Sequence, residues 1–227
     1  MKILKKNGFE AFIVGGAIRD FFLNIPFYDI DITTNAQVKD IKKIFKHSEL
    51  SISEKYGSIK IYFDENYFDI TSYRKEGIYL NYRNPSYINF VYDIKEDIKR
   101  RDFTINCLLI DDKYNLIDHF YGYKDLLKRK IKTIGDPFHK LTEDVVRMFR
   151  IFYLQARLNF EIDLNTQNAL IENIFLLKKI KKERIIQELK KIFDQKYIEK
   201  VLLSFKKTNA IFFLREFSNY FPILLEI

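Results

Sequence analysis

The first residues of the chain that could do chemistry are two glycines followed by two aspartates. Gly15 and Gly16 end an apolar run, and without a Cβ they let the backbone approach a triphosphate. Asp29 and Asp31 lie in an alternating stretch, so as strand residues they project to the same side. Two such carboxylates favour a shared divalent cation, and Mg²⁺ prefers oxygen ligands and often brings substrate phosphates. With Arg19 to neutralise phosphate charge, the stretch predicts nucleotide and metal chemistry, against the alternative of a surface turn with an exposed Asp-x-Asp.

A third carboxylate, Asp69, lies in a later predicted strand over residues 67–73. Beside the first two it would complete a two-metal site that activates a hydroxyl and holds a leaving pyrophosphate. The alternative is a solvated strand residue. We therefore predict Asp29, Asp31 and Asp69 as catalytic residues, with Asp29 and Asp31 as metal ligands.

Paired arginines precede the apolar run at residues 103–110, where we expect a central strand. Arg100 and Arg101 can bind phosphate, and Asp102 can orient one of them. The alternative is a charged helix end that precedes a strand.

A later stretch joins a carboxylate to arginines on a predicted helix. Thr142 is expected to cap this helix, and an apolar stripe on its opposite face is expected to pack. Asp144 and Arg147 are three residues apart, so one alternative is a salt bridge worth about 0.2–0.5 kcal/mol. The other is base reading: the carboxylate accepts from the exocyclic amine of cytosine or adenine, and the arginine donates to the ring nitrogen. Uracil and guanine present an oxygen instead, so the pair would select C and A.

The elements that position these residues change character along the chain. Short strands and helices alternate up to about residue 120, including a hairpin over residues 58–73 and a helix over residues 93–100 capped by Asp93. Residues 75–92 have no clear period and are expected to form a loop. From about residue 120 onward, helical stripes dominate the sequence. The pattern predicts an α+β fold with a mixed head and a helical remainder.

Composition restricts the class of protein. With 47% hydrophobic and 31% charged residues, the chain is expected to be globular, and no apolar run approaches the ~20 residues that span a membrane. The chain reaches its glycines too soon for a signal peptide. Its one cysteine, Cys107, fits a reducing compartment, so we expect a cytoplasmic protein. A net charge of +8 suits a polyanionic partner, although an AT-rich coding bias would also raise the lysine content.

Taken in order, these stretches resemble the class II tRNA nucleotidyltransferases, the CCA-adding enzymes, and their relatives the bacterial poly(A) polymerases. Gly-Gly-x-x-Arg-Asp with Asp-x-Asp (residues 15–31) is similar to the family's metal and triphosphate motif. Arg-Arg-Asp-Phe-Thr-Ile-Asn (100–106) is similar to its ribose motif, and Glu-Asp-x-x-Arg (143–147) to its base-selecting motif. Residues 182–192 resemble the helical motif that stabilises the neck. The similarity runs from about residue 9 to 195.

The resemblance implies a polymerase-β-like nucleotidyltransferase head with a small sheet over residues 1–125, a helical neck over 126–195 and the start of a truncated helical body over 196–227. It implies Mg²⁺ as cofactor, CTP and ATP as substrates, and the 3′ acceptor end of tRNA as partner. The nucleotide-binding residues would be Gly15, Gly16, Arg19, Arg101, Asp102, Asn106, Asp144, Arg147 and Arg150. The acceptor stem would be bound by charge and shape through Lys178, Lys179, Lys181, Lys182 and Arg184; the alternative for several of these is a solvated helix face.

Three further features bear on the product and the partner. The loop with Tyr79, Arg83 and Pro85 resembles the flexible element that lets such enzymes move from C to A. Tyr153 stands where the family often has a third arginine. Family members usually continue into a longer body and tail, whereas this sequence ends in an apolar stretch at residues 222–227. That stretch fits part of a longer chain, a reduced enzyme, or an end buried against a partner, for instance in a homodimer.

We therefore expect a template-independent enzyme that adds C and A to tRNA 3′ ends. The nearest alternative is an A-adding enzyme or poly(A) polymerase with the same core. An alternative of another class is a catalytically idle RNA-binding module.

Overall fold

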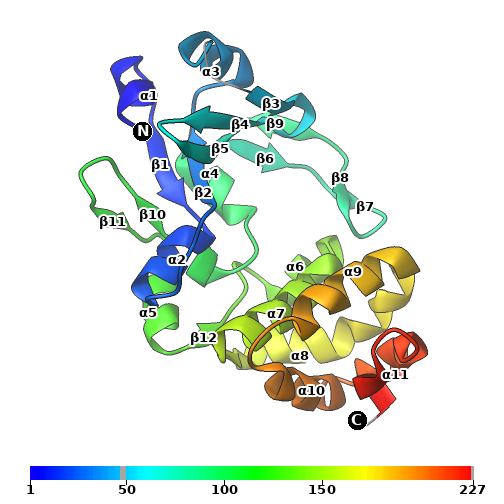
Figure 1. Cartoon of the computed structure of the whole chain (residues 1–227). Coiled ribbons are helices and arrows are strands. Elements are labelled where there is room, and N and C mark those ends of the chain that lie inside the picture. Colours follow the sequence, from blue (N-terminus) through cyan, green and yellow to red (C-terminus); the bar gives the residue numbers. More distant parts are fainter. Residues whose placement is uncertain (47–49, 226–227) are drawn as a thin grey trace. The chain divides into compact units, whose positions relative to one another are not determined.

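The computed structural model describes residues 1–46 and 50–225, and the chain divides into two compact units. Unit 1 comprises Met1–Gly77 and Pro85–Leu126, and unit 2 comprises Ile78–Asn84 and Leu127–Ile227. The α+β class is confirmed, because unit 1 contains a mixed sheet and unit 2 is mainly helical (Figure 1). The three-part division of the chain stays a prediction, and the segment Ile78–Asn84, expected in the head, groups with unit 2.

Among the described residues, seven strands of unit 1 form one sheet in the order β11-β10-β1-β2-β5-β4-β3. At its centre, β1 (Ala11–Val14) runs antiparallel to β2 (Ile30–Thr34). β2 runs parallel to β5 (Asn66–Ser72), which runs antiparallel to β4 (Ser58–Phe63). The outer strands, all joined by antiparallel pairing, are β3 (Leu50–Ser53), β10 (Leu109–Ile110) and β11 (Leu116–Ile117).

Short helices flank this sheet. They are α1 (Lys2–Lys6), α2 (Gly16–Phe22), α3 (Val38–Ile44), η1 (Glu54–Tyr56), α4 (Ile94–Lys99) and α5 (Gly122–Leu127). The predicted helix over residues 93–100 is confirmed as α4, and Asp93 caps it by accepting from the Lys95 backbone N–H at 2.8 Å. The predicted hairpin is confirmed as β4–β5. Its turn residues Asp64 and Glu65 both have positive φ, of 50° and 61°, as a two-residue hairpin turn requires.

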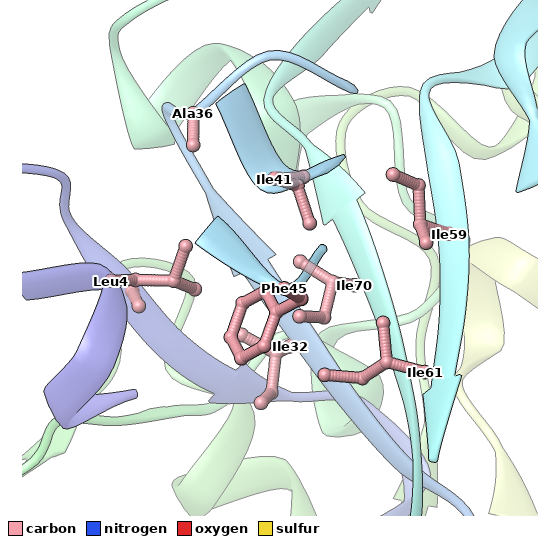
Figure 2. Packing of buried hydrophobic residues seen from close by; sticks show 9 residues of the cluster. Leu4, Ile32, Ala36, Ile41, Phe45, Ile59, Ile61 and Ile70 are labelled. Carbon is pink, nitrogen blue, oxygen red and sulfur yellow. The ribbon is translucent and has the colours of Figure 1, made fainter. Parts of the chain in front are cut away.

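A core of apolar side chains under the central strands explains which way the carboxylates point. Ile32 of β2 and Ile70 of β5 are buried together with Ile59 and Ile61 of β4 (Figure 2). Successive strand residues point to opposite faces. The residues that precede Ile32 and Ile70 therefore lie on the face away from this core.

Two expectations about unit 1 are corrected. The run over residues 103–110 is not a central strand: Thr104–Asn106 form the 3₁₀ helix η2, and only Leu109–Ile110 extend as β10. The run is apolar because Phe103, Ile105 and Leu108 are buried in this conformation too, so burial alone did not identify a strand. The expected loop over residues 75–92, part of which belongs to unit 2, contains short paired strands, namely β6 (Arg74–Glu76) with β9 (Ile88–Phe90), and β7 (Tyr79–Leu80) with β8 (Asn84–Pro85).

Unit 2 is built on the helix α7 (Val146–Leu158), whose Met148, Phe149 and Phe152 are fully buried as the stripe predicted. The Phe152 ring packs edge-on against Phe205 at 4.8 Å between centroids. The other elements are β12 (Lys130–Ile131), α6 (Pro137–Glu143), β13 (Glu161–Ile162), α8 (Leu164–Asn173), η3 (Ile174–Lys179), α9 (Lys182–Phe193), α10 (Ile198–Lys207), α11 (Ile211–Leu214), η4 (Arg215–Phe217) and η5 (Pro222–Leu225). The remainder is thus not purely helical, since β12 and β13 pair in parallel.

Among the helices of the described ranges, none combines the length and the apolarity that crossing a membrane requires. The predicted apolar end reaches residues 226–227, which lie outside the described residues.

Candidate active site

The turn between β1 and α2 brings backbone close to Asp31. Gly15 caps α2 with φ at 91°, a conformation that side chains disfavour. Val14 pairs with Asp31 across the sheet, and a Cβ on Gly15 would lie 3.1 Å from Asp31 Oδ2. Glycine is therefore required here for two reasons, its backbone angle and the space taken by the carboxylate.

Two of the three predicted catalytic carboxylates are direct neighbours. Asp31 of β2 and Asp69 of β5 are paired in register, on the face opposite the apolar core. Lys60 of β4, the partner of Asp69 on its other side, approaches it to 3.2 Å between Nζ and Oδ2. Asp29 precedes β2, which begins at Ile30, so it is not the strand residue that we expected.

The charge of Asp31 reflects this crowding. Desolvation raises the pKa of Asp31, and the carboxylates of Asp69 and Asp29 raise it further, while Arg101 opposes the shift. Asp29 therefore lies close enough to Asp31 to act on its charge. A cation bound at this point would relieve the repulsion.

Arg19 and Asn106 meet although 87 residues separate them. Arg19 is 6% exposed and donates through Nη1 to Asn106 Oδ1 at 2.6 Å, and through Nε to Asp20 Oδ1 at 2.8 Å. A Cβ on Gly16 would lie 3.3 Å from the same guanidinium. The structure thus places Gly16, Arg19 and Asn106 together, with a guanidinium under the glycine turn that is ion-paired with Asp20 at 2.7 Å.

Arg101 is held by a carboxylate that the sequence motifs did not single out. Asp97 of α4 is fully buried and accepts from Arg101 Nη2 at 3.1 Å and from Arg100 Nη2 at 2.8 Å. Burial alone would raise the pKa of Asp97, but the charges of Arg101 and Arg100 outweigh it and hold the pKa below its usual range. Asp97 therefore pairs with both arginines, a contact that the sequence motifs did not predict, and the orienting role of Asp102 stays a prediction. The spacing of Asp97, three and four residues before the arginines on a predicted helix, was the available signal.

Asp97 also links Arg101 to the strand of the carboxylates. Thr33 Oγ1, on β2, donates to Asp97 Oδ2 at 3.1 Å, and the Arg74 backbone N–H donates to Oδ1 at 3.2 Å. Arg101 lies near enough to Asp31 to oppose the rise in the pKa of that carboxyl, and the buried Nε of Arg101 has no hydrogen-bond partner within the described residues. A buried donor left unsatisfied is costly, so this one points to a ligand oxygen.

The donor set of this site suits a hard divalent cation. Carboxylate oxygens are the ligands that Mg²⁺ prefers, and it usually keeps several positions for water and substrate phosphates. No group of three or more His, Cys, Asp or Glu in the described ranges 1–46 and 50–225 is close enough to hold a metal ion by protein ligands alone. The carboxylates that fit such an ion are the Asp31–Asp69 pair with Asp29 beside it.

In unit 2, the predicted base-reading residues do not share one continuous helix. α6 ends at Glu143, α7 begins at Val146, and Asp144 between them has an extended backbone. Asp144 is 7% exposed and accepts from the Val146 backbone N–H at 3.1 Å and from Arg150 Nη2 at 3.4 Å. Thr142 does not cap the helix as expected; it lies in α6, where its hydroxyl donates to backbone carbonyls one turn earlier. The cap residue of α7 is Val145, which makes no side-chain cap hydrogen bond, and the Asp144 carboxylate accepts from the first backbone N–H of the helix, that of Val146.

Arg147 is buried and held from three directions. Its Nη1 donates to Lys140 O at 2.6 Å and to Glu143 Oε2 at 2.7 Å. Its Nη2 donates to Tyr79 Oη at 3.2 Å, and its Cζ lies 5.1 Å from the centroid of the Tyr79 ring. The stacked tyrosine, also within unit 2, restrains the plane of the guanidinium. Tyr79 came from the predicted loop, but nothing in the sequence assigned it this contact.

The basic residues expected to contact RNA gather around one cavity of unit 2. This cavity, of about 300 Å³, is lined by Lys178, Lys181 and Lys182 with Phe212 and Phe213. Lys178 Nζ lies 5.1 Å from the centroid of the Phe213 ring. Lys179 is exposed in η3 beside this group. Lys182 pairs with Glu216 at 2.8 Å.

Arg184 differs from these lysines, because it forms a salt bridge of 2.7 Å with the buried Glu188 of its own helix. This salt bridge pairs the buried Glu188 carboxylate and therefore gives Arg184 a structural role that does not depend on RNA. The prediction that all five residues bind RNA therefore stays a prediction, with Arg184 as its weakest member.

Comparisons with known proteins show which family the chain resembles. Residues 11–132 match the model of the poly A polymerase head domain, and residues 159–220 match that of a probable RNA- and SrmB-binding site of polymerase A. The CCA-adding enzyme of Staphylococcus epidermidis is 36% identical over 220 residues, which cover 96% of this chain and 55% of the relative. The chain thus spans about half the length of this curated relative.

Solved structures show the same similarity. The CCA-adding enzyme of Bacillus stearothermophilus, solved in complex with CTP, superposes with a TM-score of 0.84 and 30% identity over 92% of this chain and 50% of that one. The Thermotoga maritima CCA-adding enzyme, complexed with tRNA, gives a TM-score of 0.76 and 26% identity over 92% of this chain and 49% of that one.

Proposed function

Because the chain belongs to the family of the poly A polymerase head domain, we propose that it is a template-independent nucleotidyltransferase that adds C and A, from CTP and ATP, to the 3′ end of tRNA. The observation that carries this proposal is the in-register pair Asp31–Asp69 beside the Gly15 turn. The CTP and tRNA complexes of the two related enzymes support the choice of nucleotide and acceptor.

In the proposed reaction the 3′-hydroxyl of the RNA attacks the α-phosphorus of the nucleotide. The bond from O3′ to phosphorus forms, the bond from phosphorus to the bridging oxygen breaks, pyrophosphate leaves, and the hydroxyl proton passes to solvent. Mg²⁺ bound by Asp29 and Asp31, with Asp69 as the third carboxylate beside them, would neutralise the phosphates and lower the pKa of the hydroxyl. No covalent protein intermediate is needed.

The side chains of unit 1 would bind and orient the nucleotide. The turn at Gly15 and Gly16 lets phosphate oxygens approach the backbone, and Arg19 beneath it supplies a compensating charge. Arg101, held by Asp97, offers its unpaired Nε to a phosphate or ribose oxygen. Asp102 and Asn106 complete the proposed nucleotide-binding set.

The side chains of unit 2 would select the base. Asp144 would accept from the exocyclic amine of cytosine or adenine, and Arg147, fixed by Glu143 and Tyr79, would donate to the ring nitrogen. Arg150, in contact with Asp144, would hold that carboxylate ionised. The prediction of a homodimer through residues 222–227 and that of a cytoplasmic location remain predictions.

An incorporation assay tests this proposal. The protein with Mg²⁺, CTP and ATP is expected to complete CCA on tRNAs that end at the discriminator base, at C or at CC, and to stop there. A long tail made from ATP alone would instead favour the poly(A) polymerase alternative. If no nucleotide is incorporated on any acceptor, the enzyme assignment fails and an RNA-binding module remains.

A further inference from the structure

The central strands of unit 1 carry two exposed tyrosines next to the predicted catalytic carboxylates. Tyr62 of β4 and Tyr67 of β5 are register partners, with ring centroids 4.8 Å apart. They are 40% and 57% exposed. Neither takes part in the chemistry or the nucleotide contacts described above, and neither belongs to the apolar core.

The two rings lie on the same face of the sheet as the carboxylates. Tyr67 is two residues before Asp69, and Tyr62 is two residues after Lys60, whose Nζ reaches Asp69. Strand side chains repeat every two residues, so all four project to one side. The residues between them, Ile61 and Phe68, pack with the core on the other side. We name Lys60, Tyr62 and Tyr67 the hairpin patch.

The order of the strands separates this patch from the glycine turn. The strands lie in the order β1, β2, β5, β4 (Figure 1). Gly15 follows β1, Asp31 lies on β2 and Asp69 on β5, and the hairpin patch spans β5 and β4. The carboxylate pair therefore lies between the glycine turn on one side and the patch on the other. The site therefore has two distinct sides, the glycine turn at β1 and the hairpin patch at β5 and β4.

In-line displacement also needs two opposite sides, because the attacking and leaving oxygens lie on opposite sides of the α-phosphorus. Under the proposed function, the triphosphate and the leaving pyrophosphate lie at the Gly15–Gly16 turn. The attacking 3′-hydroxyl must then approach over β5 and β4, where the hairpin patch is. We propose that Lys60, Tyr62 and Tyr67 bind the 3′-terminal nucleotides of the RNA acceptor.

The chemistry of the patch fits an unpaired RNA 3′ end. Exposed aromatic rings stack on bases of any identity, and a lysine beside them can bind a backbone phosphate. A 3′ end that grows from the discriminator base to C and then to CC changes its terminal base in every cycle. Stacking tolerates that change, whereas hydrogen bonds to base edges would not.

The inference rests on the proposed function, and a binding measurement tests it separately. Fluorescence anisotropy with a short labelled single-stranded RNA, without nucleotide or metal, reports binding alone. We expect Tyr67→Ala and Tyr62→Ala each to weaken the affinity at least about fivefold, and the double variant more, since each stacked base contributes substantially to binding. Tyr67→Phe keeps the ring and is expected to bind within twofold of the unaltered protein.

Kinetics with tRNA provides the second readout. The Tyr→Ala variants are expected to raise KM for the RNA more than KM for CTP. Tyr114→Ala is the matched control, because Tyr114 is 82% exposed in the same unit but lies between β10 and β11; it is expected to change neither constant. The Tyr→Ala changes also remove cross-strand packing from the hairpin. The Tm of each variant therefore shows whether it is still folded under the assay conditions.

The inference is overturned if the double Tyr→Ala variant, folded as judged by its Tm, binds RNA within twofold of the unaltered protein. It is also overturned if KM for CTP rises as much as KM for RNA. Failure of the unaltered protein to incorporate nucleotide, with the anisotropy result as expected, refutes the proposed function and leaves RNA binding by the patch supported.

Discussion

At Asp31 the needs of folding and of metal binding oppose each other. The parallel pairing of β2 with β5 brings Asp69 beside it, and desolvation and the neighbouring carboxylates raise its pKa. A raised pKa in the folded state means that this carboxyl favours folding only while protonated. The contribution is lost as pH rises through the raised pKa, so at neutral pH the ionised group destabilises the chain without metal.

Asp31→Asn is therefore expected to raise Tm at pH 7 in EDTA. The amide removes the repulsion from the carboxylates of Asp69 and Asp29 and has nearly the same shape as the original side chain. The same change is expected to lower incorporation by more than about a hundredfold, since a metal ligand is lost. Added Mg²⁺ is expected to raise the Tm of the unaltered protein more than that of the variant. Thermal unfolding with and without Mg²⁺ measures both effects, and a lower Tm for Asp31→Asn in EDTA would contradict the predicted repulsion.

Asp97 stabilises its surroundings in the opposite way. Its folded pKa is depressed, so its contribution is present above its unfolded pKa of about 3.9 and is lost as pH falls towards the folded value. Asp97→Asn leaves Arg100 and Arg101 without their shared carboxylate, and breaking a buried ion pair in this way costs roughly 3–5 kcal/mol.

Urea denaturation at pH 7 measures the loss of unfolding free energy in Asp97→Asn. Glu96→Gln, on the same helix but in a surface pair with Lys99, is the control and is expected to change stability by less than about 1 kcal/mol. Equal effects of the two substitutions would show that Asp97 is not the central acceptor that its contacts indicate.

At the scale of elements, the turn from β1 into α2 combines backbone strain with crowding. Gly15→Ala places a Cβ at positive φ and 3.1 Å from Asp31 Oδ2. We expect the free energy of unfolding to fall by about 1 kcal/mol because of the backbone strain. We also expect incorporation activity to fall, because the Asp31 side chain must move away from the new Cβ. Gly8→Ala is the matched control, since Gly8 also has positive φ, 84°, but has open space around it.

Gly8→Ala should therefore cost comparable stability and leave incorporation unchanged. The comparison of Tm and of kcat/KM for the two variants separates strain from displacement of the carboxylate. A Gly15→Ala enzyme as active as Gly8→Ala would show that the turn does not position Asp31.

Within unit 2, the segment Ile78–Asn84, which contains β7, contacts the start of α7. The Val145 backbone N–H donates to Tyr82 O at 3.0 Å, and Tyr79 stacks on Arg147. Tyr79→Ala is expected to remove one of the three contacts that hold the Arg147 guanidinium, and so to reduce the preference for CTP and ATP over UTP and GTP. Tyr79→Phe, which keeps the ring, should retain most of that preference; competition among the four nucleotides measures it, and an unchanged ratio in Tyr79→Ala would contradict the role.

At the scale of the whole chain, the net charge of +8 predicts salt-dependent binding of RNA. Each phosphate neutralised contributes about 0.7–0.9 to the slope of log affinity against log salt. Lys178→Gln with Lys181→Gln, at the basic cavity of unit 2, is expected to reduce that slope by about 1–2. Lys206→Gln on α10 is the control, because it also removes a lysine charge but lies outside the cavity lining. If the salt slope of the double variant is unchanged, the cavity does not bind RNA.

Local sequence was enough for the features that neighbouring residues decide. The residue types at 15–16 predicted the glycine turn, the hairpin followed from two apolar runs around residues 64–66, and α4 followed from its Asp93 cap. Such features depend on backbone angles and hydrogen bonds within a few residues. They can therefore be read before any tertiary contact is known.

Only the tertiary structure decided how distant side chains combine. The register of β2 with β5 put Asp69 beside Asp31, and the burial of Asp97 joined Arg101 to Thr33 of the same strand. Tyr79 meets Arg147 across 68 residues of sequence. These contacts arise because packing of apolar faces fixes strand order and register, and a pattern within one segment does not contain the identity of its neighbours.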